Sequence, residues 1–303
     1  MSLETDLLID RRRLKRRLLF WRGAAVLAVL LLVVLGLGRL GAGARPHVAR
    51  LVVSGIITDD PRLTRSIAAL AGDASVRALL VEIDSPGGSV AGGESLHDAI
   101  ARVAAVKPVV TVMRGLAASA GYMIAVPAAR IYASEATLTG SIGVLLETAE
   151  VSGLLSRLGV TAGAIVSGPL KNQPSLTAPL SPEGREVLQG LVMDMYDQFV
   201  GMVAVGRHMD VTQVRALADG RPYTGRQALK LGLIDAIGGE PEARAWLAAH
   251  GVAESLPVQR LETRTLAERT LGATLGPLMK VVGFQGLNID GALAIWQPGV
   301  VGG

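Results

Sequence analysis

Three short apolar runs, separated by stretches with helical periodicity, constrain the fold of this chain most strongly. Residues 48–53, 76–83 and 109–113 form these runs, and each is predicted to be a β-strand. The second run is apolar at nearly every position, which is typical of a parallel strand buried on both faces. Gly55 is predicted to end the first strand, and a helix is predicted to start at Asp60. Strands that alternate with helices predict an α/β fold with a parallel sheet.

Two segments rich in small residues follow the second and third predicted strands. They are Asp84-Ser-Pro-Gly-Gly-Ser89, in which Pro86 fixes a turn, and Gly115-Leu-Ala-Ala-Ser-Ala-Gly-Tyr122, in which Ser119 carries the one serine hydroxyl. Ligands of open α/β sheets bind at the carboxyl ends of the strands. Ser119 is predicted to lie at a helix start, where free N–H groups favour negative charge. A purely structural turn is the alternative for each segment.

These segments suit an acyl-transfer site with Ser119 as the nucleophile. The oxygen of a tetrahedral intermediate needs backbone N–H donors, and we expect Gly87 or Gly88 to give one and Ala120 another. The glycine pair lacks the spacing of a nucleotide-binding loop. The predicted oxyanion hole is therefore Gly87, Gly88 and Ala120.

Residue types that are absent or misplaced narrow the choice of general base. The chain has no cysteine, which excludes thiolate chemistry and disulfides, and we expect neither a metal nor a cofactor. No histidine follows a predicted strand; the four are His47, His97, His208 and His250. Of the five lysines, Lys171 lies in a loop after a predicted strand at residues 162–166. Burial lowers a lysine pKa, so a lysine can act as a base where arginine cannot. A solvated surface lysine is the alternative.

The amino-terminal residues carry the positive charge of the chain. Residues 1–50 have a net charge of +7 and residues 51–303 a net charge of −3, so we expect no nucleic-acid partner for the main domain. Basic residues precede an uncharged apolar stretch at residues 23–38. A single-pass anchor is predicted at residues 23–40, with the amino terminus cytoplasmic and the catalytic domain on the outer side of the cell membrane. A signal peptide cleaved after Ala44 is the alternative.

With these residues the chain resembles the signal peptide peptidase A (SppA) family of serine proteases, relatives of the Clp protease and crotonase folds. The resemblance covers residues 48–239 and includes both small-residue segments, Thr139-Gly-Ser-Ile-Gly-Val144, the Lys171 loop and a motif at residues 218–235. It implies a ClpP/crotonase-like repeated β-β-α core with an N-terminal transmembrane helix. It also implies a Ser–Lys dyad, in which Lys171 is the base for Ser119 and Ser141 hydrogen-bonds and orients the lysine. Without the resemblance, Ser141 would be taken for a turn serine.

The same resemblance implies what the protein acts on and how it assembles. Its substrates would be peptides, namely released signal peptides or small apolar membrane segments. The chain has no internal repeat, like short family members that form homo-oligomeric rings in which the lysine reaches a neighbouring serine. The helical stretch at residues 183–209 could contribute to such a ring. A crotonase-like acyl-CoA enzyme and a catalytically silent membrane scaffold are the alternatives.

Four segments are predicted along the chain. They are a cytoplasmic basic tail at 1–22, a transmembrane anchor at 23–40, a Ser–Lys protease domain at 47–265 and an apolar C-terminal tail at 266–303. The C-terminal tail is too interrupted by polar residues and glycines to span a bilayer. It could pack on a neighbouring chain, lie on the membrane or cover the cleft.

Overall fold

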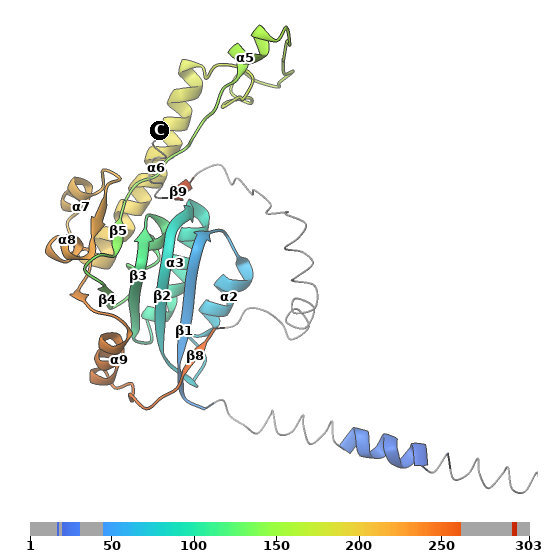
Figure 1. The fold of residues 1–303 in the computed structure, drawn as a ribbon, viewed down its shortest axis with the longest axis vertical. Coiled ribbons are helices and arrows are strands. Elements are labelled where there is room, and N and C mark those ends of the chain that lie inside the picture. The colour runs from blue at the N-terminus through green and yellow to red at the C-terminus, as the bar shows by residue number, and fades with distance from the viewer. Residues whose placement is uncertain (1–16, 18–19, 31–44, 262–292, 296–303) are drawn as a thin grey trace, which may run out of the picture. The chain divides into compact units, whose positions relative to one another are not determined.

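The computed structural model describes residues 17, 20–30, 45–261 and 293–295 (Figure 1). The chain divides into two compact units, Met1–Arg45 and Pro46–Gly303. Residues 20–30 of the first unit are helical. Among the residues that the structure describes, no helix has the length and apolar character needed to cross a membrane. Residues 31–40 of the predicted anchor lie outside the described residues.

The second unit is built on a mostly parallel sheet. Its strand order is β6-β5-β3-β2-β1-β8, while β4 pairs with β3 and β7, and β9 pairs with β2. Three parallel strands form its centre: β1 (His47–Ile57), β2 (Val76–Ser89) and β3 (Val109–Ala118). The shorter strands are β4 (Arg130–Ala133), β5 (Leu138–Gly140), β6 (Pro222–Thr224), β7 (Ala236–Ile237), β8 (Val258–Arg260) and β9 (Leu293–Ile295). The predicted parallel α/β fold is confirmed.

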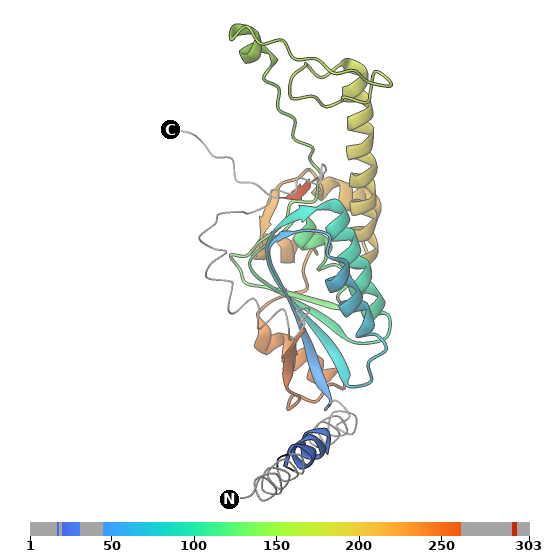
Figure 2. The ribbon, with the colours of Figure 1, turned by 90° about the vertical axis from the view of Figure 1, so that its right-hand side faces the viewer.

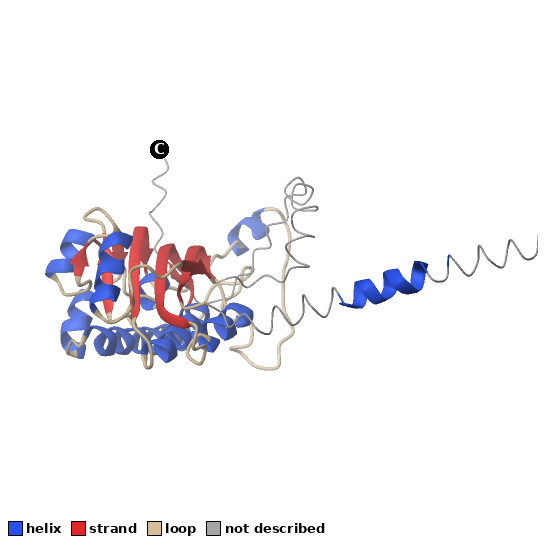
Figure 3. Cartoon of the chain, turned by 90° about the horizontal axis from the view of Figure 1, so that it is seen from below, coloured by secondary structure: helices blue, strands red, loops and turns tan. Residues whose placement is uncertain are grey.

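Helices cover both faces of this sheet (Figures 2 and 3). They are α2 (Pro61–Ala69), α3 (Val90–Ala104), α4 (Ala120–Met123), α5 (Ser152–Arg157), α6 (Pro182–Arg207), α7 (Val211–Leu217), α8 (Gly225–Lys230) and α9 (Glu240–Ala249). The main core lies under α2, α3 and the second half of α6, where Ile67, Ile100 and Phe199 are buried. On the other face, α9 buries Leu247 against β2 and β3. Helix α2 begins as predicted, because the Asp60 carboxylate accepts its first free N–H groups.

The central strands run further than their apolar runs predict. Strand β1 continues past Gly55, which adopts φ +73° at an irregularity in the β1–β2 register. Strand β2 continues through Ser-Pro-Gly-Gly, so the turn predicted at Pro86 is wrong. A side chain at Gly88 would collide with the backbone of Ile57, so glycine permits the two strands to stay paired there. Backbone hydrogen bonding extends both strands, and the pattern of apolar side chains does not predict that extension.

Residues 145–181, here called the arm, leave the sheet after β5 and end at the start of α6, and the second half of α6 leads back to the core. Figures 1 and 2 both place the arm beside the first half of α6, away from the sheet. The N–H of Val151 donates to the carbonyl of Leu176, which closes the arm on itself at 2.8 Å. The strand predicted at residues 162–166 is wrong, because these residues pair with nothing in the described chain and are exposed.

Candidate active site

Ser119 stands at a strained turn between β3 and α4. Its backbone has φ 55° and ψ −120°, a combination that L-residues rarely adopt. The residue is 1% exposed, and its hydroxyl does not cap the helix that it precedes. A strained strand-to-helix turn is the geometry that presents a serine nucleophile in α/β-hydrolases. Helix α4 is a single turn, so its dipole is small. Individual backbone N–H groups near Ser119 would therefore stabilise the negative charge of an oxyanion.

Ser141 lies next to Ser119 because β3 and β5 end together. Ala118 pairs with Gly140, and the N–H of Ser119 donates to the carbonyl of Gly140 at 2.8 Å. Ser141 also has a positive φ of 47°, and its hydroxyl donates to the carbonyl of Gly220 at 3.0 Å. The structure therefore brings two serines with unusual backbones to one edge of the sheet.

The glycine segment of β2 lies against the same turn. A side chain at Gly121 would come within 3.0 Å of the carbonyl oxygen of Ser85. The N–H of Gly87 already donates to the hydroxyl of Ser85 at 3.1 Å. Ala120 is the first residue of α4, where an N–H has no carbonyl partner within the helix. The N–H of Ala120 therefore has no acceptor within α4, whereas the N–H of Gly87 already has one in its own strand.

A partly buried polar cluster holds the serine turn in place. The hydroxyl of Tyr122 donates to the carbonyl of Leu233 at 2.8 Å, and burial raises the pKa of this phenol. The guanidinium of Arg207 donates to both oxygens of Asp235, and Asp235 also accepts the N–H of Ile131 at 2.7 Å. The cluster thus ties α4, α6 and β4 together. The sequence analysis recognised the motif at residues 218–235 but did not predict that it holds the serine turn. Tyr122 and Asp235, polar residues within the two matched motifs, were the available signal.

Lys171 lies on the arm, and one chain does not bring it to Ser119. Two residues further on, the side chain of Gln173 accepts the N–H of Ser181 and packs on Gly184 at the start of α6. Helix α6 packs on the core only from about Met195, roughly 20 Å along its axis from its start. The lysine side chain is exposed. Lys171 is therefore held at the far end of a long helix from the serine turn.

Comparison with known proteins identifies the family. The model of peptidase family S49 matches residues 101–253, half of the chain. The chain belongs to peptidase family S49. The model of the Clp protease family matches residues 53–137, which span α2, β2, α3, β3, α4 and β4. This match agrees with the mixed α/β topology and supports the predicted Clp-like fold.

Two relatives by sequence agree with this S49 assignment. A protein of Synechocystis sp., provisionally named a protease, is 39% identical over 206 residues, which cover 67% of this chain and 74% of the relative. A protein of Enterococcus faecium, provisionally named a signal peptide peptidase SppA, is 42% identical over 172 residues, which cover 56% of this chain and 50% of the relative. A solved structure of a ClpP1 mutant from Listeria monocytogenes is 17% identical with a TM-score of 0.43, over 64% of this chain and 92% of that chain.

These findings make the protein an SppA-like serine peptidase, as the resemblance predicted. The family match does not support the acyl-CoA enzyme that was the alternative.

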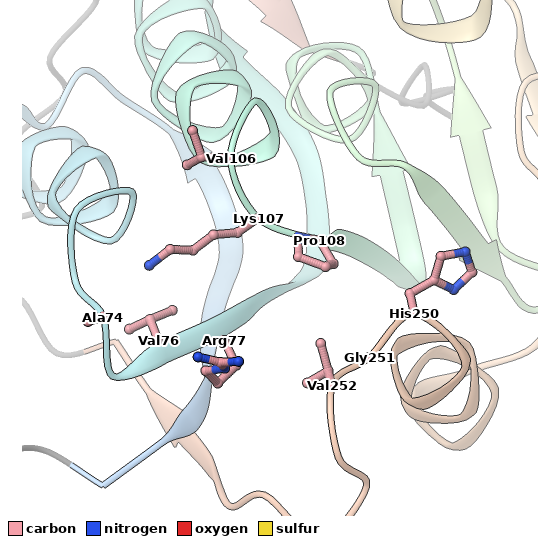
Figure 4. Close-up of a pocket in the computed structure, with 9 residues that line it drawn as sticks. All are labelled: Ala74, Val76, Arg77, Val106, Lys107, Pro108, His250, Gly251 and Val252. Carbon is pink, nitrogen blue, oxygen red and sulfur yellow. The ribbon is translucent and has the colours of Figure 1, made fainter.

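A pocket at the end of the central strands opposite to Ser119 contains another lysine (Figure 4). Lys107 and His250 line it, and Val76 and Pro108 place it at the amino ends of β2 and β3. The ammonium group of Lys107 donates to the carbonyls of the α2 end, and burial lowers the pKa of Lys107. Because β3 is 10 residues long, this lysine lies about 30 Å from Ser119. Lys107 therefore stabilises a helix end and is too far away to be the base.

Proposed function

We propose that this protein is a membrane-anchored endopeptidase in which Ser119 of one chain and Lys171 of a neighbouring chain form the catalytic dyad. The observation that carries the proposal is the strained Ser119 beside Ser141. The Ser119 hydroxyl does not cap a helix, and Lys171 is held in the arm beside the start of α6. A serine nucleophile needs a base within hydrogen-bond reach. A second copy of the chain can supply that base, because the arm extends from the domain core.

Each step then uses groups of two chains. The Nζ of Lys171 takes the proton of the Ser119 hydroxyl as its oxygen attacks the peptide carbonyl. The N–H groups of Gly88 and Ala120 stabilise the oxyanion. The intermediate collapses to an ester, and Lys171 returns the proton to the leaving amine. Water then hydrolyses the ester with Lys171 again as the base, while Ser141 accepts a hydrogen bond from the amine and orients it.

The proposed location and substrate rest on the amino-terminal residues and on the segment around Ser119. The basic residues before the apolar stretch at 23–38 support an anchor whose catalytic domain lies on the outer side of the cell membrane. An enzyme held there would meet released signal peptides and other short apolar segments. Small residues around Ser119 allow the substrate backbone to come close, which favours small apolar side chains near the scissile bond.

Mixing two inactive variants tests the shared dyad. Ser119→Ala and Lys171→Ala should each lower kcat for an apolar signal peptide by at least about 10³-fold. After subunit exchange in an equal mixture, about a quarter of the interfaces join an intact serine to an intact lysine, so about a quarter of wild-type activity should return. Lys171→Arg should stay inactive, because arginine keeps its proton.

The matched control is a chain that carries both alanines. Mixed with either single variant, it recreates no complete dyad, so activity should stay at the background level. Full activity of Ser119→Ala alone would refute the nucleophile. If subunit exchange is shown by a labelled chain but the mixture remains inactive, the dyad is not shared between chains.

A further inference from the structure

The C-terminal strand β9 pairs with the glycine segment that borders Ser119. It runs antiparallel to the end of β2, with Gly87 opposite Ile295, Gly88 opposite Ala294 and Ser89 opposite Leu293. Figure 1 shows β9 at the carboxyl end of β2, the end at which β3 leads to Ser119. The apolar C-terminal tail therefore reaches the predicted oxyanion hole through residues 293–295.

Strand pairing fixes the side of β2 on which β9 lies. On one side, β1 stays paired to the end, with Ile57 opposite Gly88. On the other side, β3 pairs with β2 only as far as Ser85, because β3 ends at Ala118 and turns at Ser119 into α4. The edge of Gly87–Ser89 that β3 leaves open is the edge that β9 occupies. This edge faces the serine turn.

Such an edge is a docking site for an extended peptide. Peptides that add a strand to a sheet edge bind through main-chain hydrogen bonds, so their sequence matters little for the pairing itself. Two glycines leave this edge without side chains, and a chain of any sequence can approach it. A substrate stretched past Ser119 would need the same N–H and carbonyl groups that β9 uses.

We propose that residues 293–295 act as a built-in competitive inhibitor that occupies the substrate-docking edge Gly87–Ser89. The inference rests on the proposed peptidase function. The tail and its target belong to one chain, so the tail acts at a high effective concentration, on the order of millimolar. Substrate binds only to the fraction of sites from which the tail is displaced, so occupancy raises KM and leaves kcat unchanged.

Proline substitutions in β9 test the inhibitor. Successive N–H groups of a strand point to opposite edges, so one of Ala294 and Ile295 donates to β2 and the other points away. Proline removes the N–H, and we expect one of Ala294→Pro and Ile295→Pro to lower KM about tenfold with kcat unchanged. The other variant is the matched control and should change KM less.

A synthetic peptide of residues 290–298 extends the test in trans. Added to the activated variant, it should inhibit competitively, whereas the same peptide with N-methyl groups at residues 294 and 295 should not. An unchanged KM in both proline variants together with no inhibition by the peptide would overturn the proposal. If the wild-type protein still cleaves the substrate when this result is obtained, the inhibitor proposal fails but the peptidase function does not.

Hydrogen exchange separates the two proposals when no cleavage is seen. The amides of Gly87–Ser89 should be protected in the wild type, and one proline variant should lose protection there without losing it at Leu79–Val81 in the strand core. If wild-type protein is inactive but this pattern holds, the strand contact stands and the peptidase function fails. Equal protection in all three proteins would refute the contact.

Discussion

Two serines in this molecule have backbone angles that serine normally avoids. Ser119 and Ser141 both have positive φ, and each directly follows the last residue of a strand. Such a conformation costs about 1–3 kcal/mol per residue and persists only where the surroundings impose it. Here β3, β5 and the hydrogen bond from Ser119 to Gly140 impose it. The strain is local, which makes it measurable by substitution at one position.

Glycine at position 119 should reveal this strain. Both Ser119→Gly and Ser119→Ala remove the hydroxyl, but only glycine accepts φ 55° without strain. We expect the glycine variant to be more stable than the alanine variant by about 1 kcal/mol, after its larger unfolded-state entropy is subtracted. Urea denaturation at equal protein concentration measures the difference. Ala101→Gly, in the regular helix α3, should instead destabilise by about 1 kcal/mol. If Ser119→Gly proves the less stable variant, the turn is not strained.

At the scale of elements, α6 has two halves with different surroundings. Its second half buries Phe199 and Val203 in the core, whereas Leu191 in the first half is exposed. The first half contacts the arm, where a side chain at Gly184 would meet the side chain of Gln173 at 2.8 Å. One helix thus connects the serine turn of its own chain to the lysine loop.

Two glycines of α6 form a matched pair that tests this link. Gly184→Ala should push Gln173 aside and misplace the Lys171 loop, which lowers kcat by about 10-fold or more with the fold intact. Gly190 faces open space, so Gly190→Ala should keep full activity and stabilise the helix by about 1 kcal/mol. In a Gln173→Ala background the clash is absent, so adding Gly184→Ala should lower kcat little further. Equal activity of both single alanine variants would show that Gln173 does not position the loop.

The elements that were predictable from sequence are those with a local signal. Helical periodicity predicts the stretch at residues 183–209, which agrees with α6 to within a few residues, and Asp60 marks the start of α2. The ends of β1, β2 and β3 were not predictable, because pairing across glycines leaves no apolar pattern. The nearness of Ser119 and Ser141 depends on the register of β3 with β5, which joins residues far apart in sequence. Residues 162–166 are apolar like a strand, but in a single chain they find no partner in the described part of the structure.

At the scale of the whole molecule, the arm leaves a group of large apolar side chains exposed in the single chain. Its exposed large apolar side chains are Leu154, Leu158, Val160, Ile165, Val166, Leu170 and Leu176. Soluble proteins rarely leave such a group of side chains in water unless another surface covers it. The proposed shared dyad requires this arm to reach a neighbouring chain. The same apolar side chains are then the contacts that hold the lysine loop there.

Charges on the arm should therefore separate the chains and stop catalysis together. Leu158 is 68% exposed and Ile165 fully exposed, so Leu158→Glu and Ile165→Glu should leave the fold of each chain intact. A buried carboxylate would instead destabilise the interface, and light scattering should show smaller particles with at least about 100-fold lower kcat/KM. Val106 is 64% exposed at the opposite end of the domain, and Val106→Glu should change neither property. Active monomers of the arm variants would contradict a dyad shared between chains, because a lone chain holds Lys171 beside the start of α6, about 20 Å along that helix from the core that carries Ser119.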